Sequence, residues 1–331
     1  MVIRGCWVSS LPLAEVAAVI EAKQGRRIAD IQIIDTQRRC YSDIWRIAVS
    51  FNGDVIHYVV KRAGSRGRHQ AELSRRADLL FAGDPSVAST ELVYLEEFEL
   101  TIGRAFSGAP LAAMTGWHPL KNPLRRYHRL RCWLLRTGSW LARYHAAARV
   151  PPGGIPLLEY VDNRRAALSQ LPNVIRERLV GVASEPFEAD FTIVHGDFTV
   201  GNILVDDEQL CVIDFGINEW TAMSAGWDVA TLLISLQRSL LFATRSPVRW
   251  LPVLLRPLQK GFLTGYAGTL ASRDLLRCLA VRHFTYVAQD PSTSLDVRTR
   301  WHFDHLMTIL NELDRSERGA LAGRRNRRDS D

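Results

Sequence analysis

The spacing of apolar residues differs between the first third of this chain and the rest. In the first third, apolar and polar residues alternate, which is typical of β-strands. In the first third of the sequence, apolar residues recur at every second position in several short runs. The dipeptide Asn52-Gly53 separates two of these runs and predicts a tight hairpin turn. The strands predicted from this pattern are residues 28–35, 44–51, 55–63 and 91–98, and the helices beside them are residues 11–23 and 66–83.

From about residue 128 onward, the apolar residues follow the helical period instead. Short apolar runs at 191–194, 203–205 and 211–215 interrupt this pattern and predict strands. The helices predicted in this part are residues 128–148, 161–171, 174–183, 227–244, 253–270, 272–289 and 297–315. We therefore expect an α+β fold with two lobes, a small β-rich one followed by a larger helical one.

The change of period also predicts the domain boundaries. The β-rich lobe would cover residues 1–97 and the helical lobe residues 98–315, followed by a basic, disordered tail at 316–331. A strand such as 92–97 would form the hinge between the lobes. Clefts between lobes are frequent ligand sites, so we expect the functional residues of both lobes to face one another.

Composition narrows the class of protein. With 331 residues, 47% of them hydrophobic, the chain can bury the cores of about two domains. The five cysteines are scattered without a CxxC pair, which argues against a disulfide framework or a zinc site and favours the reducing cytoplasm. We find no convincing signal peptide and no apolar run long enough for a transmembrane helix.

One short segment concentrates polar residues that carry chemistry. In "IVHGDFTVGNILVDDEQLCVIDFG", residues 193–216, two acids and an amide lie next to apolar strands: Asp197, Asn202 and Asp214. Phosphoryl transfer requires a carboxylate that accepts a proton and hard oxygen ligands for Mg²⁺. Taken singly, each acid is more typical of a turn. Taken together, they predict that Asn202 and Asp214 hold the metal while Asp197 faces the acceptor.

The same residues carry a resemblance to a known family. The sequence "HGDFTVGNILV", followed by "VIDFG" and "WDVA", resembles the aminoglycoside phosphotransferase and choline kinase branch of the protein kinase-like superfamily. The segment "LARYHAAA", residues 141–148, is similar to the helix that precedes the catalytic loop in that branch. The resemblance spans about residues 40–310 and is closest over 193–230.

The resemblance implies a bilobal protein kinase-like fold with ATP and Mg²⁺ in the cleft. Asp197 would be the catalytic acid-base residue, and Asn202 and Asp214 would be the metal ligands. His195 and Asp228 would be structural support for the loop. The implied reaction is transfer of the γ-phosphate of ATP to a hydroxyl group.

The resemblance also assigns nucleotide contacts in the first lobe. Lys61, at the end of a predicted strand, would hold the α- and β-phosphates, and Glu72 would anchor Lys61 through an ion pair. A solvated helix face is an equally good interpretation of Glu72. The backbone of residues 95–98, including Glu97 and Phe98, would contact adenine. No glycine-rich loop is visible over residues 35–45, so the loop that covers the phosphates is not identified.

Charge bears on the acceptor. The net charge is +7, and residues 100–158 and 229–273 contain arginine and lysine but no aspartate or glutamate. Like-charge contacts are costly, so this lobe disfavours polycationic aminoglycosides. We predict a neutral or anionic hydroxyl acceptor, either a small molecule such as a sugar or a lipid-linked glycan. Peripheral contact with the acidic inner face of the membrane is a further hypothesis, and no nucleic acid is expected as a partner.

Two other functions compete with a small-molecule kinase. A nucleic-acid-binding or regulatory pseudokinase would suit the basic charge, but the predicted catalytic set is complete. A protein kinase is disfavoured because only a short segment separates Gly216 from Asp228, too short for an activation segment. Magnesium-dependent ATP turnover discriminates these classes, while the acceptor, the oligomeric state and the choice between ATP and GTP stay open.

Overall fold

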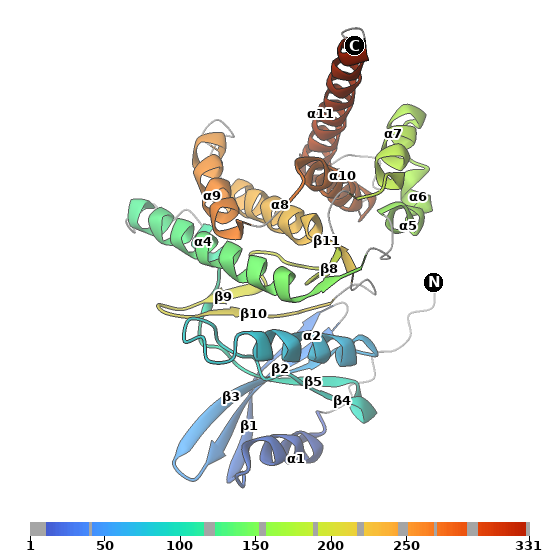
Figure 1. The fold of residues 1–331 in the computed structure, drawn as a ribbon. Coiled ribbons are helices and arrows are strands. Elements are labelled where there is room, and N and C mark those ends of the chain that lie inside the picture. The colour runs from blue at the N-terminus through green and yellow to red at the C-terminus, as the bar shows by residue number, and fades with distance from the viewer. Residues whose placement is uncertain are drawn as a thin grey trace. The chain divides into compact units, whose positions relative to one another are not determined.

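The computed structural model describes residues 11–39, 42–115, 123–151, 157–187, 191–216, 222–243, 251–267, 270–289 and 297–328. The chain forms two compact units, Met1–Gly108 and Ala109–Asp331. The first is rich in strands and the second is mostly helical, which confirms the predicted fold class (Figure 1). The boundary lies later in the chain than the predicted residue 97.

Unit 1 is built on one antiparallel sheet with the strand order β1-β2-β3-β5-β4. The hairpin between β2 and β3 forms where it was predicted. Phe51 pairs with Asp54, and Gly53 has a φ of 100°, in the left-handed region that favours glycine. The strands are β1 (Asp30–Arg39), β2 (Ser42–Phe51), β3 (Asp54–Arg62), β4 (Val93–Leu95) and β5 (Leu100–Arg104).

Two helices flank this sheet, α1 (Leu13–Gln24) and α2 (Arg66–Leu80), and Figure 1 shows them on opposite sides of it. Val16 and Ile20 of α1 join the buried core formed by residues such as Ile47 and Val60. Side chains alternate between the two faces of a strand. Lys61, next to Val60, is therefore on the face away from α1, the face that α2 covers.

The segment predicted as one strand over residues 91–98 is corrected by the structure. β4 is followed at once by a 3-10 turn, η1 (Glu96–Phe98), and then by β5, which pairs back onto β4. Glu99 closes the turn with a φ of 52°. Only Val93–Leu95 of the predicted range 91–98 is a strand, and the rest of its apolar pattern falls largely in the turn. The predicted hinge at 92–97 is therefore wrong, because the chain leaves the sheet after β5.

Unit 2 combines helices with two small three-stranded sheets, ordered β10-β9-β6 and β11-β8-β7. Helix α4 packs along α9, and α10 packs against both α8 and α11. The helices are α3 (Ala112–Thr115), α4 (Pro123–Ala147), α5 (Leu157–Asp162), α6 (Arg165–Leu168), α7 (Asn173–Ser184), α8 (Gly226–Ala243), α9 (Leu251–Tyr266), α10 (Ser272–Gln289) and α11 (Val297–Arg328). The strands are β6 (Ala109–Pro110), β7 (Arg149–Val150), β8 (Phe191–Ile193), β9 (Ile203–Val205), β10 (Leu210–Val212) and β11 (Ala222–Ser224).

Two details of unit 2 differ from the predictions. The helix predicted over residues 161–171 is not continuous: its residues belong to the end of α5 and to α6, and a turn separates these two helices. The last helix, α11, continues to Arg328, whereas the sequence predicted a disordered tail from residue 316. Alanine, leucine and arginine have high helix propensity, so the segment "ALAGRR" can extend a helix that has already begun.

The α4–α9 contact brings two helix backbones very close together, and glycine makes this possible. A Cβ atom on Gly138 of α4 would lie 2.6 Å from the backbone nitrogen of Tyr266 and would also collide with the carbonyl oxygen of Phe262. A Cβ on Gly265 of α9 would collide with the backbone of Leu135. These glycines set the spacing of the two helices, and α4 carries residues that support the polar loop described below.

We predict that Gly138→Ala lowers the free energy of unfolding by about 1–3 kcal/mol, because the added methyl group separates α4 from α9. Gly181 on α7 is the matched control, since no atom lies within 4 Å of the Cβ that an alanine would add there. Gly181→Ala should raise stability by about 0.5–1 kcal/mol through helix propensity. Urea denaturation of both variants checks the prediction. Equal stabilisation by both substitutions would contradict the close approach of the two helices.

Candidate active site

The predicted catalytic segment forms a loop between two strands of unit 2. β8 ends at Ile193, residues 194–202 form the loop, and the β9–β10 hairpin follows. In that hairpin Val212 pairs with Ile203, and the N–H of Ile213 donates to the carbonyl of Asn202 at 3.0 Å. Asp214 is the next residue along the chain. The register therefore brings Asn202 and Asp214 to the same end of the hairpin.

Left-handed backbone conformations shape this end of the hairpin. Gly196 has a φ of 85° and Gly216 a φ of 63°, values that glycine adopts without steric cost. Asp214 has a φ of 59°, which is uncommon for a residue with a side chain, although aspartate tolerates it better than most. Such a conformation persists where neighbouring contacts fix it, and it is enriched at functional sites.

His195 is buried and is tied to its neighbours through four groups. Its backbone N–H donates to Asp228 at 2.7 Å, and its carbonyl accepts from the N–H of Gly216 at 2.8 Å. The N–H of Asp197 donates to Nδ1 at 3.3 Å, so Nε2 carries the proton and donates to the carbonyl of Ile213 at 3.0 Å. Burial lowers the pKa of His195, and the nearby carboxylates only partly oppose this effect.

Asp228, on the first turn of α8, is the buried acceptor on which the loop depends. Its carboxylate accepts hydrogen bonds from the backbone N–H groups of His195 and Gly196, at 2.7 and 2.9 Å, and from His145 Nε2 at 3.0 Å. His145 Nδ1 in turn lies 3.0 Å from the hydroxyl of Tyr266. Burial alone would raise the pKa of Asp228, but the hydrogen bonds from His145 and His195 lower it below its ordinary value.

Aromatic side chains fill the space beneath the loop. Phe215, which follows Asp214, lies 4.5 Å from the ring of His195 between ring centroids. Phe198 stacks on Trp140 of α4 with centroids 5.8 Å apart. Trp140 also stacks on Tyr144, at 5.2 Å. These buried rings give the loop a rigid apolar base, against which the ring of His195 also packs.

Asp197 and Asn202 are joined directly. The amide Nδ2 of Asn202 donates to the Asp197 carbonyl and to Asp197 Oδ2, both at 2.9 Å. Because the nitrogen faces Asp197, the amide oxygen of Asn202 is directed elsewhere, and no group in the described part of the chain donates to it. Asp197 is accessible, with 29% of its side chain exposed.

A buried cation also faces Asp197. Arg282, on α10, places its Nη2 atom 3.9 Å from Asp197 Oδ1, and only 7% of its side chain is exposed. Burial disfavours the charge, but the hydroxyls of Tyr286 and Tyr160 and the carboxylate of Asp197 raise the pKa of Arg282 above its usual value. Sequence reasoning missed this residue. It lies within an apolar helical run, where no motif distinguishes a buried arginine from a solvated one.

The donor set at this end of the hairpin fits a hard cation. Asn202 and Asp214 are both half-buried and both offer oxygen atoms, the ligands that Mg²⁺ prefers. Within the described residues, no group of three or more His, Cys, Asp or Glu side chains could hold a metal by itself. Such a sparse set suits Mg²⁺, which is bound through one or two protein ligands together with phosphate oxygens and water.

The residues predicted in unit 1 show a different picture. Lys61 lies on β3, the third strand, opposite Ile44 of β2 and Thr101 of β5. Its place near the end of a strand agrees with the prediction from the sequence. Glu72 is exposed on α2, and its ion pair with Lys61 stays a prediction beside the solvated-face interpretation. Glu97 and Phe98 belong to the η1 turn before β5. Their contact with adenine stays a prediction.

We predict that Asp228→Asn lowers the free energy of unfolding by about 2–4 kcal/mol at pH 7. Asparagine keeps one acceptor but turns an N–H₂ group toward backbone donors. The lowered pKa of Asp228 means that its contribution is present above the unfolded pKa of about 3.9 and is lost as the pH falls through the folded pKa. The difference from the wild type should therefore shrink below about pH 4.

Denaturant titrations at several pH values measure this difference. Asp304→Asn, at an exposed position on α11, is the control and should change stability by less than about 0.5 kcal/mol. Similar small effects of both substitutions would show that Asp228 does not hold the loop.

Solved structures share this fold. A glucosamine kinase in complex with glucosamine, ADP and inorganic phosphate matches with a TM-score of 0.59 and 18% identity, covering 94% of this chain and 89% of that chain. A putative aminoglycoside phosphotransferase from Ralstonia eutropha matches with a TM-score of 0.57 and 15% identity, covering 89% and 95%. A Plasmodium vivax ethanolamine kinase matches with a TM-score of 0.51 and 14% identity, covering 85% and 81%. At these identities the likeness is one of fold.

Sequence comparison identifies the family. None of the curated proteins compared with this chain matches it. The sequence model of the phosphotransferase enzyme family, however, matches residues 103–269, which is half of the chain and includes the whole loop described above. The chain therefore belongs to the phosphotransferase enzyme family.

Proposed function

We propose that this protein transfers the γ-phosphate of ATP to a hydroxyl group of a neutral or anionic small molecule, with Asp197 as the base. The observation that carries the proposal is the joined pair of Asp197 and Asn202, with Asp214 at the same end of the hairpin. In the proposed reaction, Asp197 accepts the proton of the acceptor hydroxyl. The hydroxyl oxygen forms a bond to the γ-phosphorus, the bond from that phosphorus to the β-phosphate oxygen breaks, and ADP leaves.

Asn202 and Asp214 are the proposed ligands of Mg²⁺. When bound, the metal would neutralise the charge that develops on the phosphate oxygens. The hydrogen bond from Asn202 Nδ2 orients Asp197, and the same amide offers its oxygen to the metal. Lys61 is kept as the proposed phosphate contact in unit 1.

His195 and Asp228 have proposed roles that are structural. The neutral ring of His195 supports the loop without competing with Asp197 for protons, because burial lowers its pKa. Asp228 holds the backbone of His195 and Gly196, and through it the start of α8 is fixed to the loop. This arrangement restricts the position of Asp197, and positioning supplies a large part of catalysis in phosphoryl transfer.

Magnesium-dependent ATP turnover tests the proposal without knowledge of the acceptor, because water can replace it slowly. Asp197→Ala should lower turnover by about two to four orders of magnitude, since the base is lost. Asp214→Ala should remove the magnesium-dependent turnover, because a proposed ligand of the metal is lost. Asp304→Ala, on the exposed face of α11, is the control and should retain wild-type turnover. Equal turnover in the wild type and in Asp197→Ala would favour the alternative function as a regulatory or nucleic-acid-binding pseudokinase.

Peripheral contact with an acidic membrane is a second proposal, and one face of α9 supports it. Two exposed apolar and two exposed basic residues lie there at helical spacing: Val253, Arg256, Lys260 and Leu263. A helix face of this composition suits the boundary between headgroups and acyl chains. No helix in the described part of the chain is long and apolar enough to span a bilayer, so any contact would be at the surface.

Sedimentation with vesicles tests this contact. The wild type should bind vesicles that contain phosphatidylglycerol more tightly than neutral phosphatidylcholine vesicles. The double variant Arg256→Glu, Lys260→Glu should lose about tenfold or more in binding, because each basic residue near the surface contributes about 1 kcal/mol. Arg300→Glu, Arg315→Glu on α11 makes the same change of charge away from α9. Equal recovery with both kinds of vesicle would exclude the membrane contact.

A further inference from the structure

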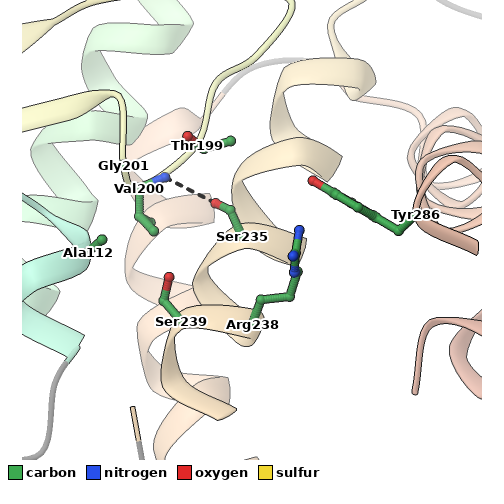
Figure 2. A pocket seen from close by; sticks show the side chains of 8 residues that line it. All are labelled: Ala112, Thr199, Val200, Gly201, Ser235, Arg238, Ser239 and Tyr286. Carbon is green, nitrogen blue, oxygen red and sulfur yellow. Dashed lines mark hydrogen bonds between the residues drawn. The ribbon is translucent and has the colours of Figure 1, made fainter. Parts of the chain in front are cut away.

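A pocket of about 360 Å³ adjoins the catalytic loop and lies entirely within unit 2. One side of it is formed by the loop itself, between Asp197 and Asn202, and the other side by α8 and α10. Its lining residues are Ala112, Thr199, Val200, Gly201, Ser235, Arg238, Ser239 and Tyr286 (Figure 2). A ligand in this pocket would therefore lie beside the residue proposed as the base.

The wall shared with the loop is held in place from two directions. The backbone N–H of Val200 donates to Ser235 Oγ of α8 at 3.1 Å, the hydrogen bond drawn in Figure 2. The carbonyl of Val200 accepts from the N–H of Ala112 at 2.9 Å. Ser235 Oγ itself donates to the carbonyl of Leu232 at 2.9 Å. Because these bonds fix the loop in the free protein, the pocket is already formed before a ligand binds.

The pocket wall carries a positive charge that has no acidic partner among the described residues. Arg238 is half-buried, and its guanidinium group lies 4.4 Å from the ring centroid of Tyr286. No aspartate or glutamate in the described part of the chain forms an ion pair with it. Arg282 lies on the same ring at 5.5 Å, and Asp197 is the acid near it. The two arginines at the ring of Tyr286 thus have one carboxylate near them, that of Asp197 beside Arg282.

Hydroxyl groups accompany this charge. The side chains of Thr199 and Ser239 line the pocket, and neither hydroxyl has a hydrogen-bond partner among the residues that the structure describes. Figure 2 places the guanidinium of Arg238 between Ser235 and Tyr286, with Thr199 and Gly201 on the other side of the pocket. Ala112 and Val200 add apolar surface. The combination of an arginine fork with two hydroxyls is suited to a compact anion.

We propose that this pocket binds an anionic group, a carboxylate or a phosphate, that is part of the acceptor molecule. A half-buried cation gains from an opposite charge and repels a like charge, so an amine would be disfavoured here. The inference rests on the proposed function and extends it: the anionic group binds at Arg238 while a hydroxyl of the same molecule reaches Asp197. The substrate class is then an acidic polyol, such as a sugar acid or a sugar phosphate.

Calorimetric titration of the full-length protein with four sugars of similar size tests this inference. The probes are glucuronate, glucose 6-phosphate, glucose and glucosamine, each added to protein saturated with ADP and Mg²⁺. At least one anionic sugar should bind about tenfold to a hundredfold more tightly than glucose and glucosamine, the effect of one charge-assisted pair. The tighter of the two anionic sugars then identifies the acidic group as carboxylate or phosphate.

Variants locate the binding to the pocket. Arg238→Met should remove the preference for the anionic sugar, and Arg238→Lys, which keeps the charge, should retain part of it. Arg256→Gln on α9 is the matched control and should keep wild-type binding, because Arg256 is exposed and outside the pocket. The ranking of the four sugars by the wild type does not depend on any variant folding correctly.

The outcomes separate this inference from the proposed function. Tighter binding of glucosamine, no binding of either anionic sugar, or an unchanged preference in Arg238→Met would each overturn the pocket assignment. None of these results affects magnesium-dependent ATP turnover, which tests the base and the metal ligands. Failure of that turnover, with anion binding intact, would instead refute the proposed reaction.

Discussion

One buried carboxylate, that of Asp228, fixes the position of the loop at residues 194–202 in unit 2. Asp228 accepts hydrogen bonds from two consecutive backbone N–H groups of the loop at residues 194–202 and from His145 of α4, with no exposure to solvent. An unpaired buried charge costs several kcal/mol, so the three donors and the acceptor stabilise one another only as a complete set. Through this set the loop, α4 and the start of α8 are held in one arrangement.

The hydrogen bonds of the loop also fix which atom of each polar side chain donates and which accepts. His195 is neutral, because burial lowers its pKa, and it uses one nitrogen to accept from Asp197 N–H and the other to donate to Ile213. A protonated ring would have no acceptor at Nδ1, so the loop selects one tautomer. Asn202 is constrained in the same way, since its nitrogen is engaged by Asp197 and its oxygen is not. The direction of each group follows from the donors around it.

The sequence predicted what local chemistry specifies. Asn52-Gly53 marked a hairpin because its backbone conformation requires glycine, and the segment 193–216 marked a site because its polar residues follow short strands at fixed spacing. It could not predict contacts between distant segments. The burial of Arg282 beside Asp197 depends on where α10 packs. The exposure of Glu72 depends on which face of α2 covers the sheet. Helical spacing alone did not decide which face that would be.

The proposed anion pocket and the proposed base are held by different contacts. Asp197 is positioned by Asn202 and lies near Arg282, whereas Arg238 lines the pocket and lies over the ring of Tyr286. A change at Arg238 would alter the charge that an acceptor meets without removing a hydrogen bond from the loop. In our proposal, the charge of Arg238, which has no acidic partner among the described residues, serves to bind the acceptor rather than to hold the loop.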